Sequence, residues 1–254
     1  MTPPSGSCPV VPPRPMRARD PSRPRHCGGR GAPSRLNPLD RIYDATDSVT
    51  VLRLSAFASG RGSNVAALHQ AIERGDLHAE LGLIVSNNSG AKVLEYAAAH
   101  GVEALHISGK THADEGAALL EALAGAETDV LVLAGYMKKL DPRVVSAYEG
   151  RAVNIHPGPL PDFGGRGMYG LHVHEAVLAA GRLETGPTVH RVTANYDEGA
   201  TLGFQPVPVE DGDTAQTLAA RVLKAEHELY WRVIADVFAT ASTPSALRLA
   251  QDES

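Results

Sequence analysis

The chain has 254 residues, a formal net charge of −5 and a pI of about 6.1. This length suits one large α/β domain or two small ones, and the acidic balance predicts neither nucleic acid nor an anionic membrane as a partner. The only cysteines, Cys8 and Cys27, lie near the N-terminus, which excludes a disulfide framework or a cysteine-ligated metal site from the rest of the chain. No apolar run approaches the roughly 20 residues that span a bilayer. The composition therefore predicts a cytoplasmic protein.

Residues 1–49 differ from the rest in composition. The first fifty residues contain eight arginines, four aspartates and ten prolines, but no lysine or glutamate. So many prolines oppose helices and strands, and so little apolar surface cannot offset the entropy of ordering. We therefore expect a disordered tail at 1–49, a folded domain at 50–240 and a flexible tail at 241–254. A nucleic-acid-binding arm or an organelle address is the functional alternative for the N-terminal tail.

From residue 51 onward, short apolar runs alternate with alanine-rich stretches of helical spacing. Apolar strands separated by helices predict an α/β fold with a mostly parallel sheet that is covered by helices on both faces. Right-handed crossovers make this a Rossmann-like open sheet. The expected strands are 51–58, 81–86, 104–107, 130–134 and 152–155, and the expected helices between them are 64–74, 91–100 and 113–124.

The last third of the domain contains two alternating strands and a long helix. Residues 188–193 and 201–209 alternate polar with apolar side chains, and we expect both strands to extend the sheet. Residues 213–238 predict the final helix, with Asp213 or Thr214 as its N-cap. The Gly- and Pro-rich stretch 157–170 is a loop long enough to suggest a function.

The motif SGRGSN at 59–64 follows the first predicted strand and opens the first predicted helix. Backbone N–H groups and the positive end of the helix converge there, which favours phosphate binding, and Ser63 and Asn64 add side-chain donors. A purely structural glycine turn is the alternative. A dinucleotide fingerprint is disfavoured because Val65 occupies the third glycine position and no acidic residue follows the second strand.

Asn154 and His156 lie at the end of a predicted central strand, where open α/β sheets place their ligands. Alternate residues of a strand point to the same side, so an amide and an imidazole face one point. That pair suits acyl transfer without a covalent intermediate, because Asn154 can bind an oxyanion while His156 donates to it or relays protons. Asp197, in a turn after the strand at 188–193, can raise the pKa of His156 only if the two are close. Structural roles for a lone histidine and for a turn aspartate are the alternatives.

A metal site is not expected. Although the chain has eleven histidines, no H-E-x-x-H pattern occurs, and His172 and His174 are spaced so that they do not share a helix face. His190, on a predicted strand, is either a support for the turn at Asp197 or a core residue.

These motifs in this order resemble the phosphoribosylglycinamide formyltransferase family of folate-dependent formyltransferases. The matching stretches cover essentially all of residues 51–240. They are SGRGSN at 59–64, DVLVLAGYMKKL at 129–140, NIHPGPLP at 154–161, HEAVLAAG at 174–181, TGPTVHRVTANYDEGATL at 185–202 and RVLKAEHELYWRVI at 221–234.

The resemblance implies a formyltransferase fold and the transfer of a formyl group from 10-formyltetrahydrofolate, a co-substrate, to the primary amine of 5′-phosphoribosylglycinamide in purine (IMP) synthesis. It implies a catalytic trio of Asn154, His156 and Asp197, in which Asp197 keeps His156 protonated while the amine attacks directly. It assigns the ribonucleotide to Gly62, Ser63, Asn64, Leu223, Lys224, Ala225 and Glu226. It assigns folate to Met137, Lys138, Lys139, Leu140, Asn154, Thr193, Ala194, Asn195, Tyr196 and Asp197. Small-molecule substrates and a monomer or homodimer are expected.

Two stretches depart from the family pattern. The family often has an arginine that contacts folate where this chain reads KTHADE at 110–115, and Lys110 is the candidate substitute. The loop at 163–170 is longer than in the shortest relatives, and it is either a lid over the active site or a surface insertion.

Other functions remain open at this point. The same chemistry serves a formyltetrahydrofolate hydrolase, or a formyltransferase acting on aminoacyl-tRNA or on a sugar nucleotide. A non-catalytic nucleotide-binding module needs only the glycine turn and would tolerate Asn154→Ala. Oxidoreduction with NAD is the least favoured alternative.

Overall fold

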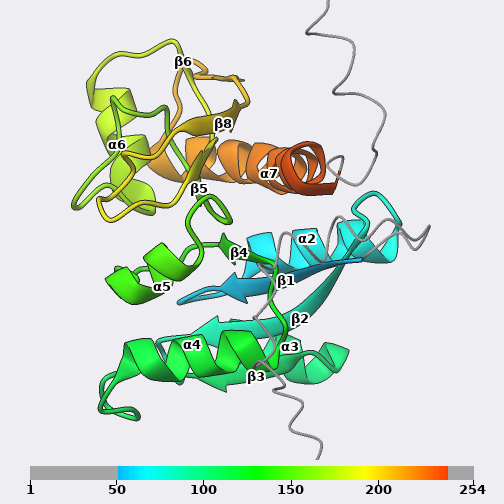
Figure 1. Ribbon diagram of the computed structural model, residues 1–254. Helices are drawn as coiled ribbons and strands as arrows, with labels where there is room; N and C mark the ends of the chain where they lie inside the picture. Colours follow the sequence, from blue (N-terminus) through cyan, green and yellow to red (C-terminus); the bar gives the residue numbers. More distant parts are fainter. Residues whose placement is uncertain (1–50, 240–254) are drawn as a thin grey trace, which may run out of the picture. The chain divides into compact units, whose positions relative to one another are not determined.

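The computed structural model describes residues 51–239 of the protein, so the expectations for 1–49 and 241–254 concern positions outside the described range. Within this range, seven strands form one sheet in the order β3-β2-β1-β4-β5-β7-β8 (Figure 1). The strands are β1 (Leu52–Phe57), β2 (Ala79–Ser86), β3 (Glu103–His106), β4 (Val130–Leu133), β5 (Ala152–His156), β6 (Glu184–Thr185), β7 (Thr188–Arg191), β8 (Thr201–Phe204) and β9 (Val207–Pro208). The helices are α2 (Ser63–Glu73), α3 (Lys92–His100), α4 (Glu115–Gly125), α5 (Pro142–Ala147), α6 (Leu171–Ala179) and α7 (Ala215–Ile234), with a π-helical extension of α7 at Ala235–Ala239.

The sheet is mostly parallel. Strands β3, β2, β1, β4 and β5 all run in one direction, whereas β7 is antiparallel to β5 and β8 is antiparallel to β7. The chain first builds outward through β2 and β3, and then returns to place β4 on the other side of β1. This reversal creates a switch point next to β1, and ligands of open α/β sheets bind outside the carboxyl ends of the strands there. The predicted Rossmann-like α/β fold is confirmed.

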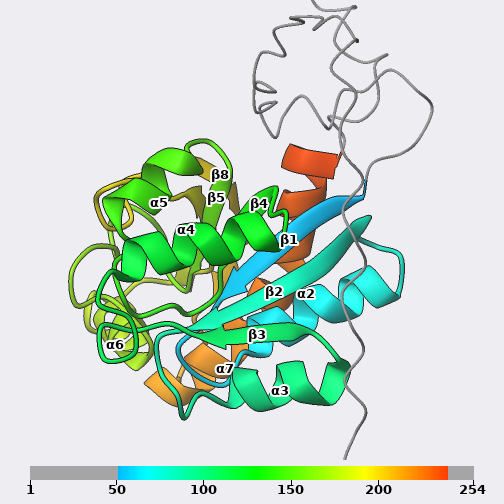
Figure 2. The ribbon, with the colours of Figure 1, turned by 60° about the horizontal axis from the view of Figure 1, so that its bottom comes forward.

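Both faces of the sheet are covered by helices. Val130 and Val132 of β4 pack in a cluster with residues of α2, α3 and α7, whereas Leu131 and Leu133 pack with residues of α4 and α5. Figure 2 shows α4 and α5 on one side of the strands and α2 and α3 on the other. Because successive side chains of a strand point to opposite faces, a strand between two helix layers must be apolar throughout. This explains the unbroken apolar run in the sequence of β4.

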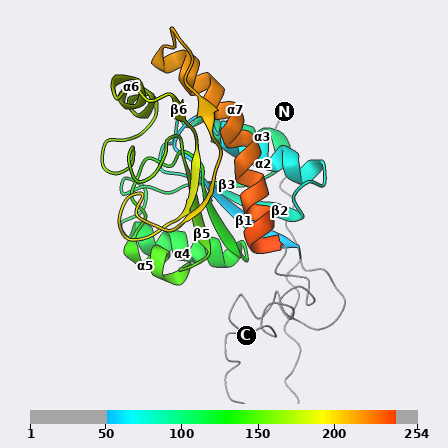
Figure 3. The ribbon, with the colours of Figure 1, turned by 90° about the horizontal axis from the view of Figure 1, so that it is seen from above.

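Helix α7 joins the sheet to the segment around α6. Its N-cap is Thr214, whose hydroxyl accepts a hydrogen bond from the N–H of Thr217, while Asp213 forms an ion pair with Arg221 at 2.7 Å. Figure 3 shows α6 on one side of α7 and α2 on the other, and residues of both helices contact α7. One helix therefore borders both halves of the folded chain.

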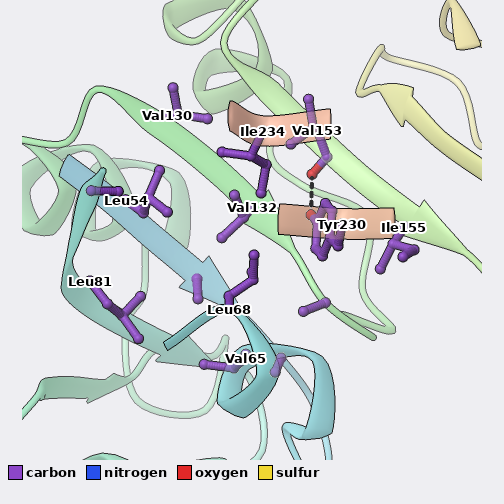
Figure 4. Packing of buried hydrophobic residues seen from close by; sticks show 14 of the residues in the cluster. Leu54, Val65, Leu68, Leu81, Val130, Val132, Val153, Ile155, Tyr230 and Ile234 are labelled. Carbon is purple, nitrogen blue, oxygen red and sulfur yellow. Dashed lines mark hydrogen bonds between the residues drawn. The ribbon is translucent and has the colours of Figure 1, made fainter. Parts of the chain in front are cut away.

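Tyr230 fixes α7 against the centre of the sheet. Its side chain is fully buried, and its hydroxyl oxygen lies 2.9 Å from the Leu133 carbonyl oxygen and 3.1 Å from the Val153 carbonyl oxygen. Figure 4 shows the ring between apolar side chains of the sheet, with the hydrogen bond to Val153 dashed. The two carbonyls belong to neighbouring strands, so the tyrosine connects α7 to the last residue of β4 and to the second residue of β5.

Three elements differ from the expectation. Helix α5 was not predicted, although Asp141 is its N-cap and Pro142 its first residue, which is a common start signal. Helix α6 was also missed, because its nine residues follow a glycine-rich loop directly. The prediction that 201–209 forms one strand of the main sheet is wrong. Only β8 joins that sheet, while β9 pairs with β6 in a separate two-stranded sheet, since Pro206 between them has no N–H to donate.

Candidate active site

A cavity of about 800 Å³ opens at the carboxyl ends of β1, β4 and β5. Cavities that bind small molecules commonly measure roughly 300–1,000 Å³, so this one has room for more than one small ligand. Its walls are the glycine turn after β1, the loops after β4 and β7, residues 165–171 and one face of α7. The sequence-predicted site residues that line it are Gly62, Ser63, Asn64, Met137, Lys138, Lys139, Leu140, Asn154, His156, Thr193, Asn195, Tyr196, Asp197, Leu223 and Glu226.

The glycine turn places the N-terminus of α2 at one end of this cavity. Gly62 is the N-cap with a φ of 75°, and no side chain caps the helix. The first N–H groups of a helix have no partner within it, so those of Ser63 and Asn64 remain available to an anion. A Cβ at Gly62 would lie 2.4 Å from Cγ2 of Val93, and therefore only glycine fits both the conformation and the space. The turn is both a structural necessity and a suitable phosphate site.

Ser59 joins the loops that frame this turn. Its hydroxyl donates to the Asn87 side-chain oxygen at 2.6 Å and accepts from the Met137 N–H at 2.8 Å. The loops after β1, β2 and β4 are thereby connected through one side chain. Ser59 does not itself line the cavity, whereas Gly62, Ser63 and Asn64 do.

Glu226 faces the same end of the cavity from α7. The carboxylate accepts a hydrogen bond from the Asn64 side-chain nitrogen at 2.5 Å, and the side chain is almost completely buried. Burial raises the pKa of Glu226 to about 7, and the hydrogen bond from Asn64 offsets only part of this effect. Near neutral pH the carboxyl group therefore changes between a donor and an acceptor for a ligand hydroxyl.

The raised pKa of Glu226 predicts a pH-dependent stability. The protonated carboxyl favours the folded state, and this contribution is fully present below the unfolded pKa of 4.5 and lost as the pH rises through about 7. The Glu226→Gln variant keeps an acceptor for Asn64 but cannot ionise. We expect it to exceed the wild type in free energy of unfolding by about 3 kcal/mol at pH 8.5, and to match it near pH 4.5. Urea denaturation at both pH values measures this difference, and parallel pH profiles of the two proteins would contradict it.

His156 is enclosed at the end of β5. Its exposed fraction is 4%, its Nε2 lies 2.7 Å from the Phe163 carbonyl oxygen, and its Nδ1 lies 3.7 Å from Oδ2 of Asp197. A carbonyl oxygen can only accept, so Nε2 carries a proton and donates it to Phe163. Burial lowers the pKa of His156, and the neighbouring Asp197 and Phe163 oppose that shift without cancelling it. Burial thus favours the neutral imidazole, whereas Asp197 favours the imidazolium.

Asp197 lies beside His156 in a strained turn. Its φ is 56°, a left-handed conformation that aspartate tolerates better than most residues. Burial on its own raises the pKa of Asp197, but the hydrogen bond from the Gly165 N–H and the nearby imidazoles of His190 and His156 outweigh it and hold the pKa below the ordinary value. The carboxylate is thus ionised at neutral pH and faces the imidazole. The proximity that sequence alone could not establish is present.

His190 connects the other members of the site. Asn154 and His190 are paired across β5 and β7, and their Nδ2 and Nε2 atoms are 3.0 Å apart. Nδ1 of His190 lies 2.9 Å from the Arg191 carbonyl oxygen, so it is the donor, and Nε2 accepts from the Asn154 amide. Nε2 is also 3.4 Å from Oδ1 of Asp197. His190 therefore orients Asn154, which leaves its second amide hydrogen for the cavity.

The remaining walls come from the loops after β4 and β7. Lys138 forms an ion pair with Glu115, and the ammonium of Lys139 lies 5.7 Å from the ring centroid of Tyr196. The first contact ties the loop after β4 to α4, and the second joins it to the loop after β7. Residues 110–115 do not line the cavity, and Glu115 reaches it only through Lys138, so Lys110 is not placed as a substitute for the missing arginine.

Three of the predicted ligand-binding residues do not line the cavity: Ala194, Lys224 and Ala225. Leu223 and Glu226 are one helical turn apart on α7 and share a face, whereas the residues between them point elsewhere. Lys224 is exposed, and Ala225 is buried in a cluster with Leu218 and Val222. The resemblance assigned consecutive residues of the stretch at 221–234 to the ligand, although a helix presents only every third or fourth residue to one side.

The loop at 163–170 was the open question of the sequence, and residues 165–170 of it line the cavity. The Phe163 carbonyl contacts His156, and the Gly165 N–H donates to Oδ2 of Asp197 at 2.8 Å. The loop is therefore a wall of the cavity and not a surface insertion. His174 of α6 also lines the cavity, and its Nδ1 is buried without a hydrogen-bond partner. This residue was not identified from the sequence as part of the site, because the short helix α6 follows a glycine-rich loop.

Among residues 51–239, no group of three or more histidine, cysteine or acidic side chains is arranged to hold a metal ion. Within the same range, no helix combines the length and the apolar character needed to cross a bilayer.

The arrangement is suited to acyl transfer. An amide hydrogen, an imidazole and a carboxylate converge on one end of the cavity, and an anion site lies at the other. These groups can bind an oxyanion and move a proton, which are the two tasks that acyl transfer requires.

Comparison with known proteins identifies the family. A model described as formyl transferase matches residues 52–234. Chloroplastic phosphoribosylglycinamide formyltransferase of Vigna unguiculata is 40% identical over 197 residues, covering 76% of this chain and 63% of the plant protein. The crystal structure of glycinamide ribonucleotide transformylase 1 from Symbiobacterium toebii has a TM-score of 0.70 and 34% identity, covering 75% of this chain and 89% of that one. Phosphoribosylglycinamide formyltransferase from Brucella melitensis has a TM-score of 0.68 and 41% identity, covering 78% and 99%.

The chain thus spans somewhat less than two thirds of the length of the plant relative that it matches. It covers nearly the whole of the two solved structures. The matched region contains every cavity residue, from the glycine turn to Glu226. On the extent of this match, the chain belongs to the formyl transferase family.

Proposed function

We propose that this chain transfers the formyl group of 10-formyltetrahydrofolate to the primary amine of 5′-phosphoribosylglycinamide, a reaction of purine (IMP) synthesis. The main support for this proposal is that one cavity contains both the uncapped N-terminus of α2 and the side chains of Asn154, His156 and Asp197. A ligand with a phosphate at one end and a reactive group at the other fits these two ends. The names of the three relatives given above support the same substrate.

The ribonucleotide occupies the end of the cavity formed by α2 and α7. Its phosphate accepts hydrogen bonds from the N–H groups of Ser63 and Asn64, where the helix dipole also favours negative charge. Glu226 receives a ribose hydroxyl, and Leu223 packs beside it. The glycinamide amine then extends toward Asn154.

The folate lies between the walls at 137–140 and 193–197. Met137 and Leu140 offer apolar surface to the pterin, and the backbone of both loops offers hydrogen-bonding groups. The formyl group on N10 is directed to the carboxyl end of β5. In this arrangement, the formyl oxygen meets the free amide hydrogen of Asn154.

The transfer proceeds by direct attack of the amine, without a covalent enzyme intermediate. The amine lone pair forms the new C–N bond, and the carbonyl π electrons move to oxygen, where Asn154 donates a hydrogen bond to the oxyanion. The neutral His156 takes a proton from the attacking nitrogen, and the imidazolium so formed is stabilised by Asp197 and by the oxyanion. The oxyanion then collapses, the bond between carbon and N10 breaks, and His156 returns the proton to N10 as tetrahydrofolate leaves.

Spectrophotometric measurement of folate product tests this function. Purified protein with 10-formyltetrahydrofolate is expected to form tetrahydrofolate only when phosphoribosylglycinamide is added. The matched control is the corresponding glycinamide riboside, which lacks the phosphate and should require a much higher concentration. Release of tetrahydrofolate without the ribonucleotide would indicate a hydrolase instead, and no turnover with either substrate would exclude both enzymes.

Three further expectations from the sequence stay predictions. They are the cytoplasmic location, the boundaries of the domain at 50–240, and the monomeric or homodimeric state.

A further inference from the structure

Residues 163–165 contact both titratable members of the catalytic trio. The Phe163 carbonyl oxygen lies 2.7 Å from Nε2 of His156, and the Gly165 nitrogen lies 2.8 Å from Oδ2 of Asp197. The two contacts come from backbone atoms only two residues apart. This stretch, called the 163–165 segment below, therefore determines where the imidazole and the carboxylate lie relative to each other.

The segment is itself firmly held. The Phe163 side chain is buried in a cluster with Val173 and Val177 of α6, and its N–H donates to the Pro159 carbonyl at 3.0 Å. Gly164 packs directly on the catalytic turn, since a Cβ there would lie 3.0 Å from Cβ of Asp197 and 2.4 Å from Cδ2 of Leu160. A segment with an anchored ring at residue 163 and close packing at residue 164 can hold two partners in a fixed geometry.

The partners of His156 define which ring nitrogen can accept a proton. Nε2–H donates to the Phe163 carbonyl, so Nδ1 is the unprotonated atom of the neutral ring, and it faces Asp197. The other titratable groups around the imidazole are His190 and His174, and both interact unfavourably with a positive charge on His156. Acceptors at both ring nitrogens are therefore needed to offset burial and these two histidines when His156 becomes charged.

We propose that the 163–165 segment is a positioning element for the reaction: the Phe163 carbonyl keeps the proton of neutral His156 on Nε2, and the Gly165 N–H holds Asp197 opposite Nδ1. Nδ1 is thereby the atom that takes the proton from the attacking amine. The imidazolium that results has an acceptor at each nitrogen. This inference rests on the proposed formyl transfer, because it assigns the path of the proton in that reaction.

Two glycines of the same loop provide a matched pair of variants. Gly165 and Gly167 both have a φ of 91° and open space around the Cβ position, so alanine strains the backbone similarly at each. Only Gly165 holds Asp197. Gly165→Ala is expected to lower kcat about 10- to 100-fold, the scale of a small misplacement of catalytic groups. It should also move the acid limb of kcat/KM to lower pH, because a displaced carboxylate stabilises the imidazolium less.

Gly167→Ala should leave the acid limb where it is in the wild type. Gly164→Ala is a second test without a positive φ, and it should act in the same direction as Gly165→Ala, since its new methyl group presses on Asp197. Nitrogen-15 NMR of His156, assigned by comparison with His156→Ala, supplies a readout independent of turnover. The wild-type ring is expected as the Nε2–H tautomer, with a lower pKa in Gly165→Ala than in Gly167→Ala.

The proposal is overturned if Gly165→Ala and Gly167→Ala give the same His156 titration, or if the neutral wild-type ring is protonated on Nδ1. A wild-type protein that transfers no formyl group would refute the proposed function separately. The NMR comparison alone would then decide whether the segment positions the two side chains.

Discussion

Replacement of Asn154 by alanine is expected to lower kcat for formyl transfer by about 10²- to 10³-fold, as the loss of a single oxyanion donor does in other acyl transfers. One amide hydrogen of Asn154 is donated to Nε2 of His190, which lies 3.0 Å from Nδ2, and the other hydrogen faces the cavity. The KM for the ribonucleotide should change little, because its phosphate binds at the far end of the cavity.

Asn88→Ala is the matched control for this variant. Asn88 is also an amide at the carboxyl end of a central strand, but it does not line the cavity, and its kcat should stay close to that of the wild type. Single-turnover kinetics separate the chemical step from product release. Wild-type single-turnover rates in Asn154→Ala would show that the oxyanion is stabilised by another group.

Replacement of Gly62 by alanine is expected to damage both the fold and the anion site. The residue has a φ of 75°, and a Cβ would lie 2.4 Å from Cγ2 and 2.7 Å from Cβ of Val93. The left-handed conformation alone costs a residue with a side chain about 1–2 kcal/mol, and overpacking typically adds 1–3 kcal/mol. The free energy of unfolding should therefore fall by about 2–5 kcal/mol. The KM for the ribonucleotide should rise, because the first turn of α2 must shift.

Gly60→Ala in the same motif is the control for stability. Its φ is not positive and no atom lies within 4 Å of the Cβ position, so the free energy of unfolding should change by less than about 0.5 kcal/mol. Adding Val93→Ala to Gly62→Ala removes the contact with Cγ2 and should restore part of the lost stability, while the 2.7 Å contact with Cβ of residue 93 and the backbone strain persist. Urea denaturation of the wild type and of the three variants measures these changes in the free energy of unfolding. Equal stability of Gly60→Ala and Gly62→Ala would contradict the steric argument.

The arrangement of the sheet could be predicted because local sequence decides most of it. Apolar runs at β1, β2 and β4 are buried on both faces, and helices between them leave few alternatives to a parallel sheet. The end of β5 was recognised as a ligand site because the topology of such sheets fixes its position. The two residues of β6 are too few to show a period, and α6 directly follows a glycine-rich loop, so both were missed.

The contacts between catalytic residues could not be predicted in the same way. His190 meets Asn154 because β7 pairs antiparallel to β5 in one particular register, and a shift of one residue would send the imidazole to the other face. The 163–165 segment contacts His156 and Asp197 through backbone atoms, so the types of its residues do not reveal these contacts. The raised pKa of Glu226 arises from burial against α2, which depends on tertiary packing. Sequence identifies the reactive groups, but their mutual distances arise from packing between distant segments.

Tyr230 and Glu226 are four residues apart on α7, about one helical turn, and this spacing limits how the protein can be redesigned. Tyr230 is anchored to the carbonyls of two strands, so it fixes the rotation and the height of the helix. A single inserted or deleted residue between 226 and 230 would rotate the carboxyl group by roughly 100° away from its ligand. Changes in substrate preference are therefore accessible through point substitutions at Gln216, Ala219 and Leu223, which line the same cavity. Variation in the length of this helix is not accessible, and libraries for directed evolution should keep its residue count constant.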